Sequence, residues 1–232
     1  MNKINQRGRY NEIPLTSLTD VTRKQVQNLV TKATDARKID EHGGWDFGCD
    51  FDRKGRGSAL NWDLYAYGKD YHTKRFLCII QVRQAFRRAA KHFLNVRKSY
   101  FLLGKNEDES VFAHPIESRV IHSAISLNKD VIKAVQSWIF NCDYKRVIRH
   151  GDIALVPVKK VPNGQTEQCP YILENSHNLN AERIISNGSL FALNPELSHI
   201  SGVHPTVKAD GWFKVIVGKR SSYWQFATPT ID

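Results

Sequence analysis

The chain of 232 residues is 41% hydrophobic and 25% charged, which excludes wholesale disorder and is typical of a folded globular protein. Its length fits one large domain or two small ones. The net charge of +11 indicates a polyanionic partner such as nucleic acid.

The first fifteen residues are polar and basic, lack the apolar segment of a signal peptide, and are expected to form a flexible arm. No apolar run approaches the roughly 18 residues that a membrane-spanning helix needs. The four cysteines form no C-x-x-C pair, and their irregular spacing is typical of reduced thiols. We therefore expect a soluble cytoplasmic protein without a membrane partner.

Helical spacing occurs in two places. From Leu18, residues 18–39 repeat apolar side chains on one face, and Thr19 or Asp20 can cap the start. Residues 117–140 repeat them again, with a break at 126–130 where Asn128 is expected to cap a second helix. Pro115 is expected at the entry to this helical region.

Strands are predicted between these helices. Residues 59–68 alternate, which places Leu64 and Ala66 on one face and Tyr65 and Tyr67 on the other. Residues 75–86 form a β-branched apolar run, and residues 95–104 form a further strand that ends before an acidic turn.

After Asp143 the sequence changes to short apolar segments separated by Gly, Asn and Pro. The predicted fold is therefore α+β, with a helix-flanked, mainly antiparallel sheet followed by a small β-barrel or sandwich domain. The predicted parts are a flexible basic arm (1–15), a basic α+β domain (16–145) and a small β-rich domain (146–232).

The positive charge is unevenly distributed. Residues 1–145 hold 25 Lys and Arg against 16 Asp and Glu, whereas residues 146–232 hold 9 against 7. No acid occurs between Asp70 and Glu107, and like charges without a counterion repel. Because guanidinium groups grip phosphates and aromatic rings stack on unpaired bases, this window predicts nucleic-acid contacts. The expected contact residues are Lys74, Arg75, Arg83, Arg87, Arg88, Lys91, Arg97, Lys98, Phe93 and Tyr100.

The C-terminal part holds histidines in turn-like segments, of which His177, His199 and His204 are the candidates for chemistry. Converging imidazoles, completed by Glu174 or Glu182, would bind a divalent metal ion. Two histidines beside a phosphate could instead cleave RNA by acid–base catalysis. Unrelated turn histidines are the third interpretation. His114 is a further candidate for acid–base catalysis, next to Pro115.

The charge pattern favours a nucleic-acid-binding protein, for RNA or single strands, acting alone or within a nucleoprotein assembly. Two alternatives stay open. One is a phosphodiester hydrolase that uses His177, His199 and His204, with or without a metal. The other is a basic adaptor that binds an acidic protein partner.

Overall fold

The computed structural model describes residues 12–35, 57–87, 95–106, 109–161, 163–202 and 205–219. They form two compact units. Unit 1 holds the described residues up to Lys105 together with Val111–Val135, and unit 2 holds those of Asn106–Ser110 and Gln136–Lys219. The boundary after Val135 falls within the third helix, whereas the sequence places it near residue 145.

Unit 1 is built on a four-stranded antiparallel sheet in the order β1-β2-β3-β4. The strands are β1 (Gly57–Lys69), β2 (Phe76–Arg87), β3 (Asn95–Lys105) and β4 (Val111–Ile116). The helices are α1 (Asp20–Asp35), α2 (Ser118–Ser126) and α3 (Val131–Phe140), and a 3-10 turn, η1 (Leu15–Ser17), precedes α1.

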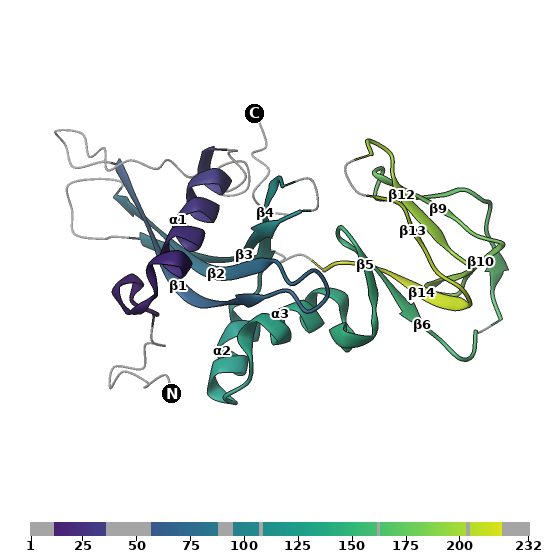
Figure 1. The fold of residues 1–232 in the computed structure, drawn as a ribbon, viewed down its shortest axis with the longest axis horizontal. Helices are drawn as coiled ribbons and strands as arrows, with labels where there is room; N and C mark the ends of the chain where they lie inside the picture. The colour runs from purple at the N-terminus through teal and green to yellow at the C-terminus, as the bar shows by residue number, and fades with distance from the viewer. Residues whose placement is uncertain are drawn as a thin grey trace. The chain divides into compact units, whose positions relative to one another are not determined.

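Helix α1 covers one face of this sheet (Figure 1). Its buried residues recur at helical spacing and share one hydrophobic cluster with alternate residues of β2, which explains why both periods are visible in the sequence. This cluster holds Val26, Leu29, Val30 and Ala33 of α1 together with Cys78, Ile80 and Val82 of β2.

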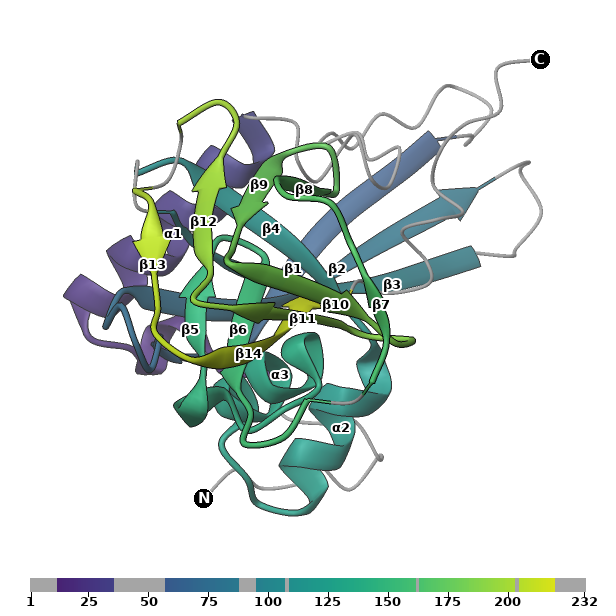
Figure 2. The same cartoon turned by 90° about the vertical axis from the view of Figure 1, so that its right-hand side faces the viewer.

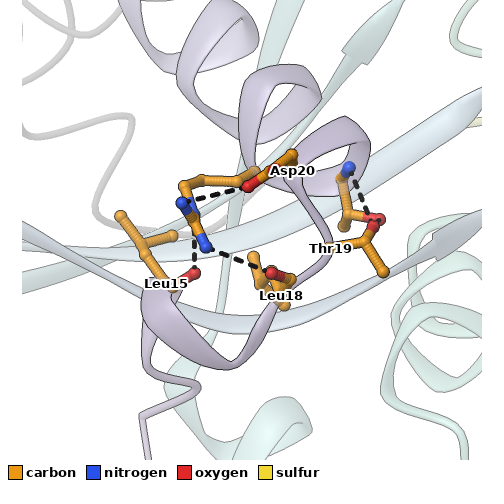
Figure 3. Close-up of polar contacts among 6 residues, drawn as sticks. Leu15, Leu18, Thr19 and Asp20 are labelled. Atoms are coloured by element: carbon orange, nitrogen blue, oxygen red, sulfur yellow. Dashed lines mark hydrogen bonds and ion pairs between the residues drawn. The ribbon is translucent and has the colours of Figure 1, made fainter.

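The start of α1 is fixed by side chains (Figure 3). The Thr19 hydroxyl accepts a hydrogen bond from the Thr22 N–H at 3.3 Å, so Thr19 is the predicted cap. The Arg23 guanidinium donates to the Leu15 and Leu18 carbonyls at 3.0 and 3.2 Å and lies 3.3 Å from the Asp20 carboxylate. These contacts join α1 to η1.

Helix α2 and the part of α3 that belongs to unit 1, Val131–Val135, lie on the other side of the sheet (Figure 1). At Gly68, a Cβ would lie 3.4 Å from the Ile132 side chain, so α3 approaches β1 closely there. The predicted helix break is confirmed, with a different cap: Asn128 ends α2 with a left-handed φ of 52°, and the Asp130 carboxylate accepts the Lys133 N–H at 3.1 Å.

A β-bulge at Tyr65 changes the predicted alternation of β1. Leu64 lies opposite Ile80, but Ala66 lies opposite Ile79, so one extra residue is inserted between them. Tyr67 consequently lies on the α1 side of the sheet, together with Leu64. The expectation that Tyr67 shares a face with Tyr65 is wrong, because side-chain alternation restarts after a bulge.

His114 and Pro115 lie in β4 rather than at a helix entry, and α2 begins only at Ser118. Proline lacks the N–H that a central strand must donate. It is tolerated here because β4 is the edge strand of the sheet.

Unit 2 contains a six-stranded antiparallel sheet, β5-β6-β14-β11-β10-β7, and a four-stranded one, β13-β12-β9-β8 (Figure 2). A 3-10 turn, η2 (Tyr144–Arg146), precedes them. The strands are β5 (Ile148–His150), β6 (Ile153–Pro157), β7 (Gln165–Thr166), β8 (Tyr171–Leu173), β9 (His177–Asn180), β10 (Arg183–Ser186), β11 (Leu190–Leu193), β12 (Glu196–His199), β13 (Val207–Lys208) and β14 (Trp212–Val217).

The core of unit 2 is formed by both sheets. Leu155 of β6 and Val215 of β14 pack in one cluster with Leu179 of β9 and Leu197 of β12. None of the sheets closes among the described residues, so the packing is that of a sandwich. The prediction of an α+β protein with mainly antiparallel sheets is confirmed. Within the described ranges, no helix combines the length and apolar character needed to cross a membrane.

Candidate nucleic-acid interface

The acid-free basic window folds into the β1–β2 turn, β2 and β3, which separates its cations. Lys74 and Arg75 lie in the turn before β2, whereas Arg83 and Arg87 lie toward the other end of that strand. At about 3.3 Å per residue, the 12 residues of β2 span about 40 Å. The cationic positions of the window therefore fall at two separated places along the sheet.

The strand register sorts the cations at the second of these places by face. Arg83 lies directly opposite Lys98, so both positions belong to one face, whereas Arg97 lies opposite Gln84 on the other. Like charges at directly opposed positions destabilise a sheet. The Lys98 side chain is exposed and has no ion pair with any residue that the structure describes. Arg88, Lys91 and Phe93 lie outside the described residues.

Tyr100 belongs to a buried polar network. It lies opposite Gln81, and these side chains are 5% and 1% exposed. The Gln81 amide donates to the Tyr65 hydroxyl at 3.0 Å and also to the Tyr100 hydroxyl, which lies 3.2 Å from Nε2 of His122 on α2. The Tyr100 ring also packs edge to face on Tyr65 and His122. This burial leaves no face of Tyr100 for an external base.

The network holds its members in their neutral forms. Burial, reinforced by the neighbouring Tyr100, raises the pKa of Tyr65, and burial also raises the pKa of Tyr100. Burial and then the positive charge of Lys98 lower the pKa of His122. Gln81, Tyr65 and His122 were not predicted as site residues, because only their meeting in space distinguishes them from ordinary sheet and helix residues.

The β1–β2 turn, residues 70–75, is held by one buried carboxylate. Asp70 is 1% exposed, and its Oδ1 accepts hydrogen bonds from the N–H groups of His72 and Thr73, both at 2.8 Å. The backbone closes around it, with Asp70 N donating to the Arg75 carbonyl at 2.8 Å and Lys74 N to the Asp70 carbonyl at 3.1 Å. The geometry of the turn is thus fixed by four hydrogen bonds.

Two tyrosine rings are exposed at this turn. Tyr67 is 45% exposed and is stacked on Phe76, with ring centroids 6.4 Å apart and planes at 26°. Tyr71 is 44% exposed, and Nζ of Lys74 lies 4.6 Å from its ring centroid while donating to the Tyr71 carbonyl. The rings of His72 and Tyr71 pack edge to face, with their centroids 5.1 Å apart. We call residues 67–76 the hairpin tip.

The charge pattern of the sequence predicts Lys74 and Arg75 at the hairpin tip but not its two tyrosines. The available signal was the pair of tyrosines on either side of Asp70, which is flanked by Lys69 and Lys74. This signal could not be interpreted from the sequence, because regular alternation without a bulge places Tyr67 on the same face as Tyr65 rather than on the α1 side of the sheet.

In unit 2, two of the three nominated histidines meet. His177 of β9 lies opposite His199 of β12, and their ring centroids are 4.6 Å apart, edge to face. His150 of β5, which was not nominated, packs edge to face on His177 at 5.2 Å. His150 and His177 are 3% and 2% exposed, and His199 is half-buried. We call these three residues the histidine cluster.

Hydrogen bonds fix the rings of this cluster. His150 Nε2 donates to the Pro205 carbonyl at 3.0 Å. His177 Nδ1 lies 2.9 Å from the Ser176 hydroxyl and 4.0 Å from the Asp152 carboxylate. His199 Nδ1 accepts from the Ser201 N–H at 3.1 Å. This bond and the 2.7 Å distance from His199 Nδ1 to the Ser201 hydroxyl hold the ring against its turn.

This arrangement does not form a metal centre from the described residues. No group of three or more His, Cys, Asp or Glu among the residues that the structure describes could hold a metal ion. Glu174 is exposed in a turn, with φ of 47°. His204 lies outside the described residues, so the metal site stays a prediction.

His114 is half-buried in β4 of unit 1, where it lies opposite Leu102. Its role in acid–base catalysis stays a prediction.

No protein-family model matches the chain, and neither a curated protein nor a solved structure matches it.

Proposed function

We propose that the protein binds nucleic acid through unit 1. The observation that carries this proposal is the directly opposed pair Arg83 and Lys98, within a window that contains no acid. A sheet that places two cations at opposed positions is stabilised when an anion lies between them. A phosphodiester backbone supplies such anions at regular spacing along the strand.

The distribution of charge supports the same conclusion. The excess of cations is concentrated in residues 1–145, which contain the sheet of unit 1, and is small in residues 146–232. A polyanion is therefore attracted to one part of the chain. Its affinity would fall linearly with salt on logarithmic axes, with a slope of about 0.7 to 0.9 for each phosphate contact.

The test is a titration of a labelled oligonucleotide followed by fluorescence anisotropy at several salt concentrations. Lys98→Glu and Arg83→Glu are expected to weaken binding and to reduce the salt slope by about one contact each. Lys129→Glu is the matched control, because it changes the net charge equally at an exposed position outside the window. Equal losses in all three variants would contradict a local binding face, and salt-independent affinity would contradict nucleic-acid binding.

A phosphodiester hydrolase is the second candidate function. It is favoured by the meeting of His177 with His199 beside Asp152. Of these two rings, only His199 is accessible enough to touch a substrate, where an imidazole could take up or donate a proton. Incubation of end-labelled RNA with the protein and with His199→Ala tests this. Cleavage that is lost in the variant, while binding is retained, supports it; intact RNA with the unaltered protein rejects it.

A further inference from the structure

The hairpin tip exposes aromatic surface that the fold could have buried. Tyr67 and Tyr71 lie four residues apart, and each leaves nearly half of its side chain in solvent. Two exposed tyrosine rings within one short segment are a candidate interaction site, because tyrosine is enriched at protein interfaces. Tyrosine suits such a site, because its large rigid ring has few rotatable bonds to immobilise on binding.

The tip is rigid before any ligand binds. The buried Asp70 carboxylate holds the N–H groups of His72 and Thr73, so the backbone that carries Tyr71 is fixed. Tyr67 is supported from behind by Phe76, which packs in turn against the core under α1. A preorganised surface loses little conformational entropy when a ligand binds.

Cations surround these rings. Lys69 and Lys74 are exposed, Arg75 is half-buried, and the only acid of the turn, Asp70, is buried. Lys74 adopts a left-handed φ of 58°, a conformation that glycine adopts with the least steric strain. A lysine at this position places an ammonium group beside the Tyr71 ring at a cost in backbone strain, which indicates that the side chain contributes to a function.

From this geometry we propose that the hairpin tip is a base-stacking subsite that takes unpaired nucleotides of a single strand. The inference rests on the proposed function and names its ligand class. An unpaired base stacks on the exposed part of Tyr71 or Tyr67, and Lys69 or Lys74 contacts the adjoining phosphate. A duplex cannot bind in this way, because each of its bases is already covered by its neighbours.

The experiment compares three ligands of the same length by anisotropy: a single strand, its duplex, and an abasic strand that keeps the phosphates but lacks the bases. The single strand is expected to bind more tightly than the abasic strand. Tyr71→Ala is expected to weaken binding of the single strand by about 5- to 100-fold and to leave the abasic strand unaffected. Tyr71→Phe is the matched control, since it keeps the ring and should bind as the unaltered protein does.

The outcomes separate this inference from the proposed function. If no nucleic acid binds, or if an acidic peptide of equal charge binds as tightly, the proposed function fails. If all three ligands bind equally and Tyr71→Ala changes nothing, nucleic-acid binding stands and the stacking subsite is overturned. An unchanged thermal midpoint in Tyr71→Ala is expected for an exposed ring, and Tyr71→Phe provides the folded reference if the midpoint falls.

Discussion

The hairpin tip of unit 1 and the histidine cluster of unit 2 are both groups of aromatic rings with polar atoms. They differ in which part is buried and which part is exposed. At the tip, the buried group is the Asp70 carboxylate, and the rings of Tyr67 and Tyr71 are exposed. In the cluster, the rings of His150 and His177 are themselves buried. A ring contributes to stability where it is buried and is available to a ligand where it is exposed. Substitutions at the two places should therefore separate folding from binding.

The largest expected effect is a loss of stability when the histidine cluster is disrupted. His177→Ala removes a buried ring together with its contacts to His150, His199 and the Ser176 hydroxyl, and should lower the free energy of unfolding by about 2–4 kcal/mol. Urea denaturation measures this loss. His199→Ala, at the half-buried end of the cluster, should cost less. The oligonucleotide affinity of the folded protein should not change in either variant. A loss of affinity at unchanged stability would show that the histidine cluster serves binding rather than folding.

The next effect is expected at the hairpin tip. Asp70→Ala leaves the N–H groups of His72 and Thr73 without their buried acceptor, which should cost about 2 kcal/mol and weaken single-strand binding because the rings lose their support. Asp70→Asn keeps a side-chain oxygen and should lose less of both. Urea denaturation measures the free energy of unfolding of these variants, and anisotropy measures their affinity for a single strand. If Asp70→Ala binds as tightly as the unaltered protein, the fixed turn is not what presents the rings.

The polar network adds a dependence on pH. Because burial and Lys98 lower the pKa of His122, the folded state binds a proton less readily than the unfolded chain does. The contribution of neutral His122 to stability is complete above the pKa of histidine in the unfolded chain, about 6.5, and is lost as the pH falls below that pKa. In His122→Gln this part of the loss should be absent. Thermal midpoints measured across this range test the difference, and parallel curves for the two proteins would contradict it.

The smallest effect separates folding from binding at one residue. Lys74→Gly removes the strain of a left-handed lysine and should stabilise the protein by about 0.5 kcal/mol, because the gain exceeds the extra entropy of glycine in the unfolded chain. The same variant removes an ammonium group beside Tyr71 and should bind a single strand less tightly. A variant that is less stable and binds equally well would show that Lys74 is placed for folding alone.

Much of the fold could be predicted from apolar spacing. Helix α1, the break between α2 and α3, and the strands β1 to β3 follow from the periods of buried residues, because each of these elements buries residues at the spacing of its own geometry. The bulge at Tyr65 has no comparable signal, since any residue can be inserted without changing the composition of the strand. The position of Pro115 depended on β4 being an edge strand, which is a property of the sheet order.

The candidate sites were predicted less completely, because they depend on contacts across strands. Lys74 and Arg75 were found from charge alone, whereas the face of β1 on which Tyr67 lies is a consequence of the bulge. His177 and His199 were found by residue type, but the packing of His177 on His199 and on His150 depends on the pairing of β9 with β12 and on the place of β5. Burial decides whether a ring can meet a ligand, and the sequence does not contain that information locally.

The most direct test of the account is photo-crosslinking of a bound single strand, followed by identification of the crosslinked peptides. The account predicts crosslinks at peptides that contain Tyr67 or Tyr71, and their loss in the abasic strand. Crosslinks confined to Gln136–Lys219, the unit that holds the histidine cluster, would contradict it.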